Sequence, residues 1–248
     1  MTRSTANLLL VLAAAIWGAA FVPQATAMQA MSPTWFLALR FTISTAVIAP
    51  LALREARLAP RSLDRGSLGL MVLVGVVFLA GNLLQQVSLL TTSVANAGFL
   101  TSLYILFTPF AAMALSHERP SGAVWPAAGL GLVGAWLLSG GLSGRFVIGD
   151  LLVTLGAIGW AVQIVLLGLV TRRVDRPMTL VAIQGGLVAL VCGAWAATHD
   201  PISVDAIATA GWELAYTGLV SGFVGYSLQA IAQRHTEASD AAIVFSTE

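Results

Sequence analysis

The chain has 248 residues, of which 58% are hydrophobic and 9% are charged, and its mean hydropathy is +0.88. Soluble domains carry about 25% charged residues, so these residues cannot cover a water-facing surface, and a polytopic membrane protein is indicated. The net charge of +1 comes from twelve arginines and eleven acids, without a lysine. No basic patch suited to nucleic acid occurs among them.

Apolar stretches of about twenty residues are long enough to cross a bilayer as helices. Eight such stretches cover residues 7–29, 33–53, 67–90, 95–116, 123–140, 149–171, 179–198 and 209–233. A ninth begins near Asp240 and is cut off at Glu248, so we expect a fragment that lacks the end of a ten-span protein. For residues 7–29 a signal peptide is the alternative, but Trp17 and Pro23 interrupt its pattern, and a retained helix is expected.

The arginines lie in alternate loops. One side holds ten of them: Arg3, Arg54, Arg57, Arg61, Arg65, Arg119, Arg172, Arg173, Arg176 and Arg234. The opposite loops hold Arg145 with Asp200 and Asp205. Because basic residues of short loops stay in the cytoplasm, we expect a cytoplasmic N-terminus in a cell (inner) membrane protein.

An internal repeat relates Gly81–Ser102 to Gly225–Ser246 at an offset of 144 residues. The identical pairs are Gly81/Gly225, Leu84/Leu228, Gln85/Gln229, Thr92/Thr236, Ala97/Ala241 and Ser102/Ser246. Trp17 and Trp160 correspond at an offset of 143. The copies are five spans apart and therefore enter the membrane from opposite sides, as in the inverted repeats of secondary transporters.

The predicted fold class is thus an all-α polytopic membrane protein with a 5+5 inverted-repeat transporter fold, truncated within the ninth span. Residues 1–141 form the first repeat with five spans. Residues 142–248 form the second, with three spans and the start of a fourth.

Polar and aromatic side chains inside spans are the candidate site residues, because lipid tolerates polar groups poorly. We expect them to line a central cavity, with aromatic walls and with amides that orient a solute. The candidates are Trp17, Gln24, Asn82, Gln85, Tyr104, Trp160, Gln163, Gln184, Tyr226 and Gln229. The amides could instead hydrogen-bond across helix pairs, and the tryptophans could be interfacial anchors.

Arg40 lies about 10 Å inside the non-cytoplasmic edge of its span at the helical rise. One interpretation is a cation at the cavity mouth that attracts an anionic or zwitterionic group. The other is snorkelling to the interface. Glu213, near the same side of the eighth span, is the candidate ion-pair partner of Arg40 and a candidate proton site.

Catalytic and metal-binding patterns are missing from the sequence. It has no HExxH or Walker motif, Cys192 is alone, and the three histidines lack ligand spacing. We therefore expect no enzyme activity, no cofactor and no metal site.

Several motifs together resemble the EamA-type transporter family of the drug/metabolite transporter superfamily. They are Trp17-Gly18, Leu39-Arg40-Phe41, the stretch TTSVANAGFLTSLYILFTP at 91–109, His117-Glu118-Arg119-Pro120 and Ser246-Thr247-Glu248. The resemblance implies ten helices around a central cavity, alternating access, and export of amino acids, metabolites or drugs. We predict a secondary-active inner-membrane exporter whose partners are a small solute and the bilayer. A passive channel or facilitator, a non-transporting scaffold fragment and a homodimer stay open.

Overall fold

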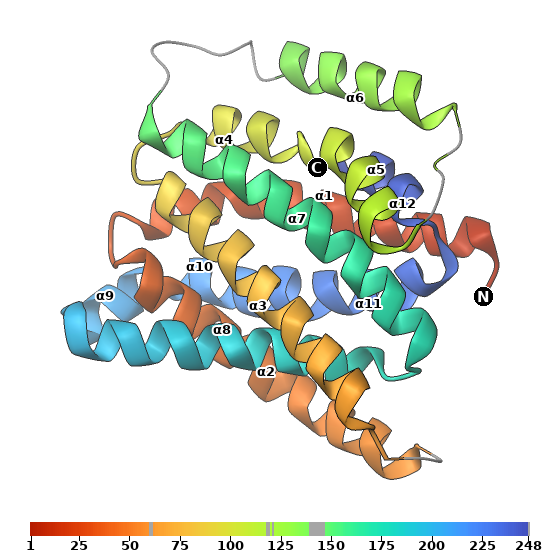
Figure 1. The fold of residues 1–248 in the computed structure, drawn as a ribbon. Helices are drawn as coiled ribbons and strands as arrows, with labels where there is room; N and C mark the ends of the chain where they lie inside the picture. Colours follow the sequence, from red (N-terminus) through yellow and green to blue (C-terminus); the bar gives the residue numbers. More distant parts are fainter. Residues whose placement is uncertain (60–61, 118–119, 121, 139–146, 248) are drawn as a thin grey trace.

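The computed structural model describes residues 1–59, 62–117, 120, 122–138 and 147–247, and every regular element in them is helical (Figure 1). Six helical stretches are long and apolar enough to cross a membrane: α1 (Arg3–Ala27), α2 (Pro33–Leu58), α3 (Arg65–Ser88), α4 with α5 (Val94–Leu115), α7 (Ile148–Arg173) and α8 (Pro177–His199). The prediction of an all-helical, multi-pass membrane protein is therefore confirmed.

Some residues on which the sequence predictions depend lie outside the described part. These are Arg61, Glu118, Arg119, Arg145, Glu248 and the expected boundary between residues 141 and 142.

Helix starts follow from local hydrogen bonding. Ser32, Asp64 and Ser93 each accept a backbone N–H three residues later and so begin α2, α3 and α4. Such caps satisfy N–H groups that the first helical turn leaves free.

Two expected spans are broken rather than continuous. The stretch 95–116 divides into α4 (Val94–Thr101) and α5 (Tyr104–Leu115). Between them the Ser102 hydroxyl donates to the Phe99 carbonyl at 2.6 Å, and such back-bonding bends helices.

The other break lies in 209–233. This stretch contains α10 (Gly211–Ala215), the π-helix η1 (Tyr216–Gly225), α11 (Tyr226–Ala232) and the short 3-10 helix η2 (Gln233–His235). Short α9 (Val204–Thr209) comes before it and α12 (Ala238–Phe245) after it. Ten residues of π-helix exceed the usual single turn, and such segments are frequent at functional sites.

The helices pack in pairs that are far apart in sequence. α2 runs against α8, α3 crosses α7, and α1 contacts both η1 and α11 (Figure 1). α6 (Val124–Leu138) lies at the edge of the bundle, where it contacts α5 and α12.

Hydrogen bonds fasten α2 to α8 at both ends. At one end Glu55 of α2 accepts the backbone N–H groups of Met178 and Thr179, at 3.2 and 2.8 Å. At the other end Asp200, directly after α8, accepts the hydroxyls of Ser32 and Thr34. The two helices therefore form one fixed antiparallel pair.

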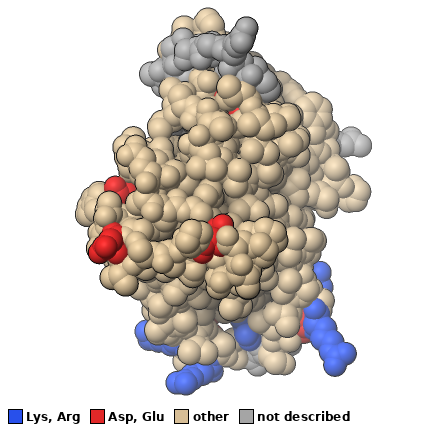
Figure 2. Space-filling model, turned by 90° about the vertical axis from the view of Figure 1, so that its left-hand side faces the viewer, with Lys and Arg blue, Asp and Glu red and all other residues tan. Residues whose placement is uncertain are grey.

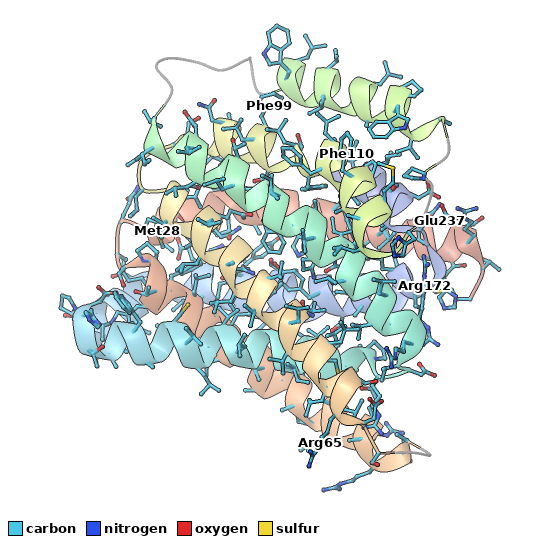
Figure 3. All side chains as sticks on the ribbon, viewed as in Figure 1. Met28, Arg65, Phe99, Phe110, Arg172 and Glu237 are labelled. Carbon is cyan, nitrogen blue, oxygen red and sulfur yellow. The ribbon has the colours of Figure 1, made fainter. Side chains whose placement is uncertain are left out.

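The ends of the bundle differ in charge. Arg172 and Glu237 lie at the end that carries the N-terminus, and Met28 lies at the opposite end (Figure 3). Figure 2 views that opposite end, where acidic groups lie across the face and basic groups lie along its lower edge. At the N-terminal end Arg3 pairs with Asp240 at 2.6 Å.

Candidate functional site

A cavity lined by residues of the described part lies between the two ends of the bundle. Its empty space is about 520 Å³, including the part open to solvent. The lining comes from α1, α2, α3, α4, α5, α7, η1, α11 and α12, so both the N-terminal and the C-terminal half of the chain contribute. α6 and α8 contribute no lining residue from the described part.

Most of the predicted site residues surround this cavity. Nine of the eleven line it: Trp17, Gln24, Arg40, Gln85, Tyr104, Trp160, Gln163, Tyr226 and Gln229. The other two lie behind the wall: Asn82 donates to the Phe78 carbonyl of its own helix at 2.9 Å, and Gln184 accepts from Gln163 at 3.1 Å.

Five further lining residues were not among the candidates: Phe21, Thr101, Ile164, Ser221 and Phe245. Thr101 carried a usable signal, because it shares a helical face with Tyr104. The apolar side chains carried none, since a Phe that faces a cavity and one that faces lipid look alike in sequence.

Arg40 is buried in the wall of the cavity, with 2% of its surface exposed. Its Nη1 donates to Gln24 Oε1 at 2.8 Å, and its guanidinium carbon lies 4.8 Å from the Phe41 ring centre and 5.7 Å from that of Phe36. Snorkelling places the guanidinium in water, so this burial excludes the snorkelling interpretation.

The expected ion pair between Arg40 and Glu213 is absent. Glu213 Oε1 instead accepts the Thr26 hydroxyl at 3.2 Å, in the last turn of α1. Among the described residues no carboxylate lies within the 4 Å of an ion pair to Arg40. Gln24, one helix away, occupies the position that the acid was expected to fill.

Trp17 and Trp160 each lie against a glycine of a distant helix. A Cβ added at Gly225 would lie 2.7 Å from Trp17 Nε1, and one added at Gly81 would lie 3.3 Å from Trp160 Cε2. The indole N–H groups are bound, that of Trp17 to the Ser221 carbonyl at 3.4 Å and that of Trp160 to Gln85 at 2.9 Å. Both rings line the cavity, as the cavity interpretation predicts.

Aromatic rings form one wall of the cavity. The Trp17 ring centre lies 5.0 Å from that of Tyr226 and 5.2 Å from that of Phe245, and Tyr226 also packs edge-on against Phe78 at 4.7 Å. These are favourable aromatic separations, and the tilted rings together form an apolar wall.

Buried glutamines connect the cavity to the N-terminal end of the bundle. Gln229 donates to Gln163 at 3.3 Å and to Gln233 at 3.2 Å, and Gln233 in turn donates to the Ile164 carbonyl. Gln163 donates to Gln184. These amides therefore link α7, α8 and α11, which agrees with the interhelical alternative for Gln184.

Charged lining is limited to one residue. Arg40 is the one ionised side chain among the cavity residues that the structure describes, and the described chain holds no cluster of three metal-ligating side chains. The cavity can hold a small solute through one cation, several amides and aromatic faces.

A polytopic helical bundle with a central, partly polar cavity is the architecture of a membrane transporter. The EamA-like transporter family matches this chain at residues 4–140 and 147–248. The chain therefore belongs to the EamA-like transporter family.

Two known proteins are similar to this chain. The chain is 29% identical over 246 residues to an uncharacterized transporter of Archaeoglobus fulgidus, covering 99% of this chain and 75% of the relative. A solved crystal structure of a protein superposes with a TM-score of 0.76 at 19% identity, covering 99% of this chain and 85% of that one. At that identity the likeness shows the fold alone.

Proposed function

We propose that this protein is a secondary-active exporter of small solutes that works by alternating access. The observation that carries the proposal is the central cavity, which is built from both halves of the chain and holds a buried cation, amides and an aromatic wall. Solute sites near the midplane between two halves are typical of secondary transporters.

The crossed Trp–Gly packing supports an inverted-repeat plan. Trp17 of the first half lies on Gly225 of the second, and Trp160 of the second half lies on Gly81 of the first. The two tryptophans differ by 143 residues and the two glycines by 144. Residues 1–141 and 142–248 are accordingly proposed as the two repeats, with the cavity between them.

The arginine distribution supports a cytoplasmic N-terminus in the cell membrane. The N-terminus lies at the same end of the bundle as Arg57, Arg173 and Arg234, which lie on α2, α7 and η2. Asp200 and Glu213 lie at the opposite end. Basic residues stay on the cytoplasmic side. The proposed partners are the bilayer and one small solute, with a monomer or a homodimer as the assembled form.

Gradient-driven flux tests the proposal. The protein is reconstituted in liposomes with a panel of labelled amino acids, monocarboxylates, sugars and cations, and a proton gradient is imposed. We expect accumulation of at least one solute above equilibrium, which is lost in Gln24→Leu. The matched control Gln29→Leu, at an exposed position just beyond α1, should retain it.

Each other outcome contradicts a defined part of the proposal. Equilibration without accumulation would identify a passive facilitator. Absence of flux for every solute would identify a non-transporting scaffold. For proton coupling, Glu213→Gln should abolish accumulation and preserve downhill flux, and unchanged accumulation would remove Glu213 as the proton site.

A further inference from the structure

Arg40 carries a buried charge without a counterion. It is 2% exposed, and its one hydrogen bond to a described residue goes to the neutral Gln24. Its Nε atom is buried without a hydrogen-bond partner. A single charge in a low-dielectric interior is unfavourable unless paired, and two contacts with Phe36 and Phe41 offset part of that cost.

The backbone around Arg40 is packed closely by the neighbouring helix η1. η1 approaches α2 so closely that a Cβ at Gly218 would lie 3.0 Å from the Arg40 carbonyl oxygen, and a Cβ at Gly222 would lie 3.0 Å from Ser44 Cβ. Two glycines four residues apart allow such close helix contact in membranes. The backbone at Arg40 is therefore packed directly against η1, and the guanidinium is held in the cavity wall by Gln24 and by the rings of Phe36 and Phe41.

The remaining cavity is neutral and lacks a site for a second charge. None of its described lining residues is an acid or a histidine. An anion of charge −1 would neutralise Arg40, whereas an ammonium group would find no counterion. Thr101 Oγ1, which also lines the cavity, is a second buried polar atom without a partner and can donate to an anion.

We infer that the solute is a monocarboxylate with an apolar body, whose carboxylate binds the free Nε edge of Arg40. A planar guanidinium matches a carboxylate through paired N–H bonds. The aromatic wall of Trp17, Tyr226 and Phe245 receives the apolar body. A phosphoryl dianion would need a second cation, which the described lining does not supply. This inference rests on the proposed function of the cavity and names its solute class.

Binding of a matched phenyl series to the full chain in lipid nanodiscs tests this inference. The probes are phenylacetate, its neutral amide phenylacetamide, its zwitterionic amine derivative phenylglycine, and the cation 2-phenylethylamine. Affinity is measured by tryptophan fluorescence and by the shift of the thermal midpoint, which rises when a ligand binds the folded state. We expect phenylacetate to bind about ten- to a hundredfold more tightly than the other three, the contribution of a hydrogen bond to a charged group.

Variants of two arginines on the same helix identify the residue responsible. Arg40→Gln should remove the preference for phenylacetate, and Arg40→Lys should retain part of it. Arg54→Gln, an identical change at an exposed position of α2, should leave the preference intact. Equal affinity for phenylacetamide or phenylglycine, no binding of phenylacetate, or a preference that persists in Arg40→Gln would each overturn the inference.

Failure of this inference and failure of the proposed function give different results. Flux of neutral or cationic solutes in liposomes without binding of phenylacetate overturns the carboxylate site and leaves the transporter intact. Binding of phenylacetate with no flux of any solute overturns transport and leaves the site.

Discussion

Substitution of Gly225 by alanine probes the contact between α1 and the end of η1. An added Cβ would lie 2.7 Å from Trp17 Nε1, and ordinary contacts begin near 3.4 Å, so the ring must move by about 0.7 Å. Tyr226 and Phe245 confine the ring at 5.0 and 5.2 Å between centres. Overpacking costs about 1–3 kcal/mol of stability. Replacing a glycine stabilises the fold by about 0.4–1 kcal/mol, because it lowers the conformational entropy of the unfolded chain. We therefore expect Gly225→Ala to lower the unfolding free energy by about 1–2 kcal/mol.

Two other glycines serve as a graded series for this prediction. Gly81→Ala meets Trp160 at 3.3 Å and should lose less stability, because a shift of a few tenths of an ångström relieves it. Gly129→Ala meets nothing within 4 Å and should be neutral or stabilising. Equilibrium unfolding in mixed micelles, followed by tryptophan fluorescence, ranks the three. If Gly225→Ala proves as stable as Gly129→Ala, the close approach of Trp17 is refuted.

Two further predictions concern the fastening of α2 to α8. Glu55→Ala removes the acceptor for the Thr179 N–H and hydroxyl and should lower the unfolding free energy by about 1–2 kcal/mol. The control Glu237→Ala, at a helix start without a side-chain cap, should lower it less. Equal losses of stability in the two variants would contradict a capping role for Glu55. Hydrogen bonds from Thr34 and Ser32 hold the pKa of Asp200 below its ordinary value of 3.8. The stability that the ionised Asp200 adds is present above its ordinary pKa and is lost as the pH falls through the lower pKa of the folded protein. The thermal midpoint of Asp200→Asn should therefore fall less steeply in acid than that of the parent chain. Parallel curves of thermal midpoint against pH would contradict this prediction.

Six of the expected spans could be predicted from sequence because apolar length decides them. Residues 149–171 were expected as a span, and α7 covers Ile148–Arg173. The break in 209–233 could not be predicted, because tertiary contacts permit it. η1 presents Gly218 and Gly222 to α2, and no local propensity in 209–233 indicates a π-helix.

The cavity was partly predictable because lipid disfavours amides, so buried glutamines had to face protein or a solute. That rule selects Gln85 and Gln229 correctly as lining residues. It cannot separate Gln229 from Gln184, whose side chain is as buried as that of Gln229 but contacts Gln163. The partner of Arg40 was predicted wrongly because topology places Glu213 at the right depth without indicating the direction of its side chain.

The two helix breaks and the fixed α2–α8 pair together indicate which helices can move during transport. Arg40 lies on α2, which is held at both ends by Glu55 and Asp200. Tyr226 and Gln229, which also line the cavity, lie on α11, directly after the π-helical segment η1 that packs against α2. A solute bound to Arg40 would therefore keep a fixed anchor on α2 while α11 shifts along it. We expect alternating access here to come from movement on the α11 side of the solute, with the arginine as its stationary side.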